Sequence, residues 1–176
     1  KYQGECAILE KCSKYFILRT SWLYGRFKQN FVYMMLNLFY RKSTIEIVDD
    51  QTGSPTNCTD VCLAIIKLIT SNAIQYGLYH FSNTGKTDWY EYTCKIFELA
   101  MQYKTLPRDL QLTVRILPIT TSEYKTNAPR PVNSYLDSSK FSNMFHVKIR
   151  TWQEALEDFV KGLKPVIGGY NARPHS

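Results

Sequence analysis

A serine and a tryptophan follow the first apolar strand that the sequence predicts, at the carboxyl end of that strand. The run Tyr15–Arg19 is short and almost wholly apolar, a pattern typical of a strand buried on both faces of a parallel sheet. Ser21 and Trp22 come directly after it, where open α/β sheets bind their ligands. An indole in an exposed turn can lie against the apolar face of a sugar ring. We therefore interpret Trp22 as a ligand-binding residue rather than a core tryptophan.

A turn-rich loop further along the chain carries groups suited to a nucleotide. Within Asp50–Thr56, Gly53 and Pro55 fix a turn whose amides and side chains, Gln51 among them, can meet a base or a phosphate. An ordinary loop between a strand and a helix explains most of these residues almost as well.

Arg130 is the best candidate for binding a phosphate group. It lies between two prolines, so its guanidinium fork loses little entropy when it binds a diphosphate. Asn133 and Ser134, a few residues on, can add neutral hydrogen bonds. The alternative for Arg130 is a salt bridge on the surface.

The overall charge is compatible with an anionic ligand but does not require one. Lys and Arg number 22 against 15 Asp and Glu, a formal net charge of +7. No block of five or six like charges occurs, which disfavours nucleic acid, and no apolar run approaches the ~18–20 residues that span a bilayer. We expect a cytoplasmic protein whose five cysteines are buried free thiols. We also expect His80 and His146 to be core histidines.

The elements that must position these residues alternate between strand and helix patterns. Asn30 predicts the N-cap of a helix through Arg41, whose apolar stripe includes Met34. Further helices are predicted over 2–14, from a cap at Thr56 or Asn57 with Ile65 and Ile69 on the apolar face, from a cap at Thr87 or Asp88 to residue 101, from 138 and from 151. Further strands are predicted over 44–48, 77–82 and 114–118. The alternation predicts an α/β protein, although several helices follow their loops too closely for one regular doubly wound sheet.

Seven short motifs occur in a fixed order along nearly the whole chain. They are RTSWLY at 19–24, NFV at 30–32, VDDQTGSPT at 48–56, GLYH at 77–80, TDWYEY at 87–92, RPVNSYLD at 130–137 and WQEAL at 152–156. Any one of them is weak evidence, but the seven in sequence are specific. Through them the chain resembles the extended short-chain dehydrogenase/reductases, and most closely the dTDP-4-dehydrorhamnose reductase family.

The resemblance implies an architecture and a reaction. Residues 1–176 would be the C-terminal part of a Rossmann-like NAD(P)-binding fold, interleaved with the small mixed α/β substrate-binding domain of extended short-chain dehydrogenases. The family reduces the C4 keto group of dTDP-4-dehydro-L-rhamnose with NADPH or NADH, and its glycine-rich dinucleotide loop does not occur in this sequence. We therefore expect a dTDP-sugar as ligand, a cofactor bound mainly by a preceding N-terminal part, and no activity of these 176 residues alone. A homodimer is compatible with the resemblance.

The resemblance also assigns roles to particular residues. Lys1 would be the lysine of a catalytic Tyr-x-x-x-Lys pair, stabilising a phenolate one helical turn upstream and hydrogen-bonding the nicotinamide ribose. Six residues would bind the substrate: Ser21, Trp22, Asn30, Gln51, Arg130 and Asn133. Some members of the family dimerise through a metal that glutamates hold, one of them at the position of Thr59. Because threonine is a poor ligand beside a carboxylate, we expect no metal here.

Two other classes of protein share much of this motif order. One is a non-catalytic, NADP-binding regulatory subunit resembling that of methionine adenosyltransferase. The other is a related sugar-nucleotide epimerase or dehydratase, which normally lacks the Ser-Trp turn. The runs RTSWLYG and DDQTGSPT favour the reductase over the regulatory subunit.

Overall fold

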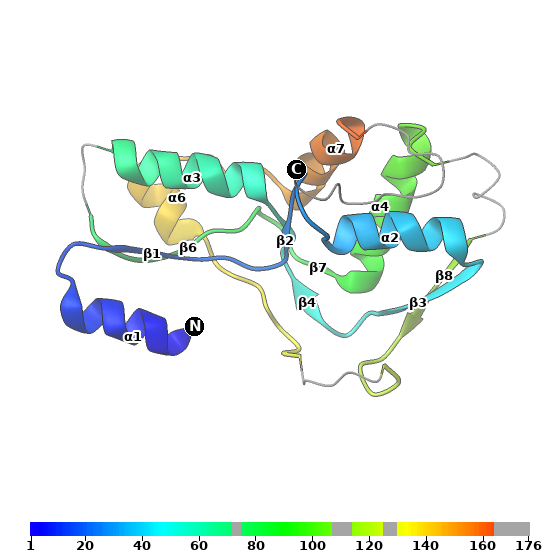
Figure 1. The fold of residues 1–176 in the computed structure, drawn as a ribbon, viewed down its shortest axis with the longest axis horizontal. Coiled ribbons are helices and arrows are strands. Elements are labelled where there is room, and N and C mark those ends of the chain that lie inside the picture. The colour runs from blue at the N-terminus through cyan, green and yellow to red at the C-terminus, as the bar shows by residue number, and fades with distance from the viewer. Residues whose placement is uncertain (72–74, 107–113, 125–129, 164–176) are drawn as a thin grey trace.

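The computed structural model describes residues 1–71, 75–106, 114–124 and 130–163 (Figure 1). Its elements in chain order are α1 (Tyr2–Lys11), β1 (Phe16–Arg19), β2 (Leu23–Tyr24), α2 (Phe31–Arg41), β3 (Thr44–Val48), β4 (Thr52–Gly53), β5 (Thr56–Asn57), α3 (Cys58–Thr70), β6 (Gly77–His80), β7 (Thr87–Asp88), α4 (Trp89–Gln102), β8 (Arg115–Ile119), α6 (Ser139–Phe145) and α7 (Trp152–Lys161). This order confirms the α/β class.

The strands form separate pairs instead of one sheet. β1 pairs in parallel with β6, β2 with β5 and β3 with β8, whereas β4 and β7 are antiparallel. The expectation that the chain builds no single regular doubly wound sheet is thus confirmed for the described residues. The prediction that the first strand is buried on both faces was wrong. In β1 only Ile17 is buried and Arg19 is exposed, because β6 is the one described strand beside it and α1 buries no residue.

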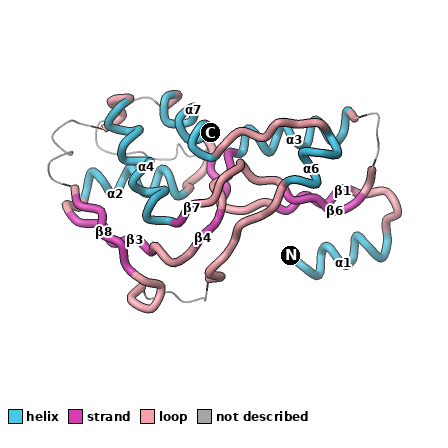
Figure 2. Tube along the Cα trace, turned by 180° about the vertical axis from the view of Figure 1, so that it is seen from behind, coloured by secondary structure: helices cyan, strands magenta, loops and turns pink. Residues whose placement is uncertain are grey.

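Two apolar clusters form the core. The larger one packs α2, α4 and α7 together against β3, with Leu36, Ile96 and Leu156 fully buried. The smaller one joins α3 and α6 to β6 through Tyr79 and Phe141. Figures 1 and 2 show α3 and α6 on one side of the β1–β6 pair and α1 on the other, with β2, β4 and β7 between the two clusters. The short strands therefore lie in the middle of the molecule.

Three helices begin at a residue that the sequence predicted as a cap, with Asn57 rather than Thr56 as the cap of α3. Asn30 accepts from the amide of Tyr33 at 3.3 Å, and Asn57 accepts from that of Thr59 at 2.8 Å. Thr151 forms a capping box with Glu154 at the start of α7. Each cap fixes the residue at which its helix begins. It thereby also holds the end of the preceding loop in the middle of the molecule.

The apolar stripes of α2 and α3 were predicted less well. Met34, Ile65 and Ile69, which we expected to be buried, are 47%, 43% and 73% exposed. Four residues of the predicted stripes are buried as expected: Met35 and Phe39 on α2, and Ala64 and Leu68 on α3. Val32, Tyr33 and Leu36 on α2 and Asp60 on α3 are buried as well. Both helices are apolar on more than one side, so residue spacing alone did not identify the side that faces the core.

The expectations for cysteine and histidine were partly wrong. The five cysteines are free, but each is half-buried or exposed. His146 is exposed, since it ends α6 in the left-handed conformation, and the buried Nε2 of His80 has no hydrogen-bond partner among the described residues. Within the described ranges, no helix is long and apolar enough to cross a membrane, and no cluster of three or more His, Cys, Asp or Glu is placed to hold a metal.

Candidate functional site

The Ser21–Trp22 turn leads from β1 to β2 in a strained conformation. Trp22 has φ = 46°, a region that costs a non-glycine residue roughly 1–3 kcal/mol. The turn is held by the 54–56 segment: the Ser21 hydroxyl donates to the carbonyl of Ser54 at 3.4 Å, and the amide of Thr56 donates to the carbonyl of Trp22 at 3.1 Å. Such a conformation persists only where its surroundings fix it, and it is characteristic of ligand-contacting positions.

The indole of Trp22 is half-buried among other aromatic rings. It stacks on Trp89 with 3.5 Å between ring centroids and 11° between planes, and Phe31 packs on Trp89 in turn at 4.5 Å. A Cβ at Gly53 would lie 2.5 Å from Cε2 of the same indole, so a larger residue there would displace the ring. One face of Trp22 is therefore covered, and a sugar can meet only the surface that remains. The role of Trp89 was missed, although the residue lies in the motif TDWYEY.

Gln51 is turned into the protein in this structure. Its side chain is buried, and its Nε2 donates to the hydroxyl of Thr121 at 3.0 Å. The neighbouring carboxylate of Asp50 accepts from the hydroxyl and the amide of Thr121, which lowers the pKa of Asp50. Both residues hold the segment that follows β8, and a contact between Gln51 and a ligand stays a prediction.

The segment around Asn133 lies beside β4. The amide of Ser134 donates to the carbonyl of Thr52 at 2.7 Å, and the two segments meet in a parallel bridge between Thr52 and Asn133. The exposed Asn133 side chain accepts from the amide of Tyr135 at 3.0 Å. Arg130, three residues earlier, is also exposed. The structure thus brings the 130–134 segment next to the loop that carries Gln51 and Gly53.

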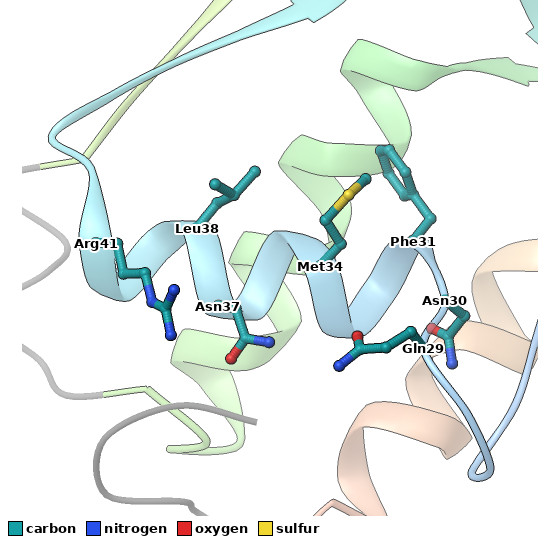
Figure 3. A pocket seen from close by; sticks show the side chains of 7 residues that line it. All are labelled: Gln29, Asn30, Phe31, Met34, Asn37, Leu38 and Arg41. Carbon is teal, nitrogen blue, oxygen red and sulfur yellow. The ribbon is translucent and has the colours of Figure 1, made fainter. Parts of the chain in front are cut away.

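Asn30 is engaged at both ends of its amide. Oδ1 caps α2, and Nδ2 donates to the carbonyl of Gly25 at 2.8 Å. The same residue borders a shallow hollow along α2 of about 560 Å³ (Figure 3). The hollow is lined by Gln29, Asn30, Phe31, Met34, Asn37, Leu38 and Arg41. Through Phe31 it adjoins the aromatic rings around Trp22.

Lys1 is exposed and directly precedes α1. The helix is tied to β1 by an ion pair in which Arg19 Nε and Nη2 donate to the carboxylate of Glu5 at 3.0 and 2.5 Å. The hydrogen bonds from Arg19 lower the pKa of Glu5. Figure 1 shows the N-terminal end of α1 directed toward the middle of the molecule. Lys1 is therefore at the end of the helix that is nearer the short central strands.

Parallel strands with helices on both sides, and polar loops at their carboxyl ends, define a Rossmann-like α/β protein. Residues 1–164 match the family model of the RmlD substrate binding domain. The chain belongs to this family, that of the dTDP-4-dehydrorhamnose reductases. The resemblance seen in the seven motifs is thereby confirmed.

The similarity extends to individual proteins and solved structures. A dTDP-4-dehydrorhamnose reductase of Aggregatibacter actinomycetemcomitans is 36% identical over 162 residues, which are 90% of this chain and 54% of that protein. The crystal structure of a Bacillus anthracis reductase in complex with NADP matches with a TM-score of 0.78 at 38% identity, over 90% of this chain and 52% of that one. An orthologue from Clostridium acetobutylicum gives 0.79 at 31% identity, over 91% and 52%. The chain spans about half the length of these relatives.

Proposed function

We propose that this chain is the sugar-nucleotide-binding part of an NADPH-dependent reductase that converts dTDP-4-dehydro-L-rhamnose to dTDP-L-rhamnose. Residues 1–176 would act as the C-terminal portion, in which the last Rossmann-like elements are interleaved with the substrate-binding domain. Family membership supports the reaction. The observation that carries the proposal to this chain is the strained Trp22 turn, held beside the 51–56 and 132–134 segments.

An aromatic surface would bind the sugar of the ligand, and a cation would bind its diphosphate. The uncovered part of the Trp22 indole can meet the apolar side of a deoxysugar. The exposed guanidinium of Arg130 can pair with the diphosphate in a bidentate way. Ser21, Asn30 and Asn133 would add neutral hydrogen bonds, whereas Gln51 would have to release Thr121 or act through it.

Lys1 is the residue of this chain that we assign to the reaction itself. The cofactor supplies a hydride to the C4 carbonyl when it is bound. The exposed Lys1 ammonium fits a contact with the nicotinamide ribose, and its charge would lower the pKa of a phenol one helical turn before it. A phenol so tuned can protonate the developing alkoxide near neutral pH. Most contacts to the dinucleotide would come from residues outside these 176.

The proposal is tested by assaying the full-length protein for enzymatic turnover. With NADPH and dTDP-4-dehydro-L-rhamnose we expect consumption of NADPH and a product heavier than the substrate by two hydrogens. Replacing Lys1 by Met should lower kcat by about 10²–10⁴-fold, the usual contribution of acid–base catalysis. Lys11→Met, at the exposed end of the same helix, is the matched control and should keep the wild-type rate.

Other results would assign the protein elsewhere. Tight binding of NADP without turnover would indicate a regulatory subunit, and an isomerised product without net oxidation of NADPH would indicate an epimerase. We place the reductase in the cytoplasm, because its nucleotide-sugar substrate and NADPH are cytoplasmic metabolites. A homodimer remains a prediction, and sedimentation of the purified protein tests it.

A further inference from the structure

The indole of Trp22 contacts two residues that lie in, or directly after, one strand pair. Trp89 covers one face of the indole at 3.5 Å between centroids. Gly53 lies so close to the ring atoms Cε2, Cζ2 and Nε1 that a Cβ there would approach them to 2.5–2.8 Å. Both residues are connected to the β4–β7 ladder, in which Gly53 pairs with Thr87. Because Trp89 is only two residues beyond Thr87, the ladder holds both Gly53 and Trp89 beside the same indole.

Trp89 is itself firmly anchored. It opens α4 directly after the N-cap Asp88, whose side chain accepts from the amide of Glu91 at 2.7 Å. The carbonyl of Trp89 accepts from the hydroxyl of Thr93 at 2.7 Å, and Phe31 packs against its ring from α2. The ring of Trp89 therefore acts as a fixed surface, against which the indole of Trp22 can be aligned.

We propose that Trp89 and Gly53 form an indole clamp that sets the angle at which Trp22 faces the sugar. In this clamp Trp89 is a positioning residue: it acts through Trp22 and does not itself meet the substrate. The positive φ of Trp22 persists only where the surrounding residues fix it, and the two contacts of the clamp supply part of that support. The sugar-binding part of this inference rests on the proposed function, whereas the clamp itself does not.

The clamp has a spectroscopic signature that is independent of any substrate. Two indoles stacked at this distance couple their transitions and give an exciton couplet in circular dichroism. The chain holds three tryptophans, and Trp152 packs edge-on against Tyr92 instead of joining the stack. Trp89→Phe should abolish the couplet, and Trp152→Phe should retain it. A couplet that survives Trp89→Phe overturns the clamp.

The second measurement separates positioning from folding. In the full-length enzyme, Trp89→Ala should raise KM for the dTDP-sugar roughly two- to tenfold, the range set by an aromatic pair of ordinary strength, while kcat changes less than twofold. Trp89→Phe keeps a ring against the indole and should recover part of the loss. Trp152→Phe also removes an indole from the larger core, so it controls for lost stability and should keep the wild-type KM.

Each outcome bears on one hypothesis. An unchanged KM in Trp89→Ala, or a fall in kcat alone, would overturn the positioning role. Equal increases in KM for Trp89→Ala and Trp152→Phe would also overturn it, since general loosening of the core would then explain both. If the wild-type enzyme fails to turn over the dTDP-sugar while the couplet behaves as expected, the clamp stands and the proposed function fails.

Discussion

Arg150 binds two carboxylates that differ sharply in exposure, and replacing each in turn tests how the two cores are joined. The side chain of Asp60, at the start of α3, is 11% exposed, and that of Asp158 on α7 is 66% exposed. Arg150 Nε donates to both oxygens of Asp60, at 2.9 and 3.1 Å, and the Asn83 amide donates to the same carboxylate at 2.7 Å. We expect Asp60→Asn to be strongly destabilising and Asp158→Asn to be nearly neutral.

The magnitudes follow from burial. Removing one partner of a buried ion pair typically costs 3–5 kcal/mol, because the remaining charge stays buried without compensation. The Arg150 side chain is 31% exposed and keeps Asp158, so the low end of that range applies to Asp60→Asn, about 3 kcal/mol. The pair with the exposed carboxylate of Asp158 should contribute about 0–1 kcal/mol.

Urea unfolding of the two variants at neutral pH, in low and high salt, measures both values. The contribution of Asp158 should fall further as salt screens it, while that of Asp60 should change little. Equal losses for the two variants, or a salt-sensitive loss for Asp60→Asn alone, would refute the reasoning, because burial would then not decide the strength of the pair.

Three further predictions concern the capping box of Thr151, the ion pair between Glu5 and Arg19, and the close approach of Gly53 to the Trp22 indole. Thr151→Ala should lose about 1 kcal/mol of unfolding free energy by breaking the capping box, measured by denaturant unfolding. Because Arg19 holds the folded pKa of Glu5 below its usual 4.5, the stability from this pair is present above that pH and is lost as pH falls through the lower folded value. The protection factors of the α1 amides, which are corrected for the intrinsic exchange rate at each pH, should therefore fall in acid, and Glu5→Gln should remove this dependence. Gly53→Ala should cost about 1–3 kcal/mol by overpacking the indole, whereas Gly4→Ala, with open space around it, should be neutral or stabilising.

Local features of the structure could be predicted from the sequence, and non-local ones could not. Asn30 and Thr151 were identified as caps, and the cap of α3 was narrowed to Thr56 or Asn57, because a cap is a contact between a side chain and an amide two or three residues away. The stack of Trp22 on Trp89 joins residues 67 positions apart, and only the β4–β7 pairing brings them together. A rule based on the spacing of residues in the sequence cannot predict such a contact.

The same limit explains Met34 and Gln51. Met34 and Met35 were both assigned to the core, but α2 is apolar on several sides and only Met35 of the two is buried. Gln51 was selected for its place in a ligand-like loop. The structure buries it against Thr121, a partner 70 residues away whose position depends on the β3–β8 pairing.

The Glu5–Arg19 ion pair also defines a short mechanical path between the two kinds of chemistry proposed for this chain. Lys1 is four residues before Glu5, and Trp22 is three residues after Arg19. One turn of helix, one ion pair and one strand end thus connect Lys1, which we propose to assist proton transfer, with Trp22, which we propose to face the sugar. A single-residue insertion on either side of the ion pair would change the length of this connection while leaving Lys1 and Trp22 themselves intact.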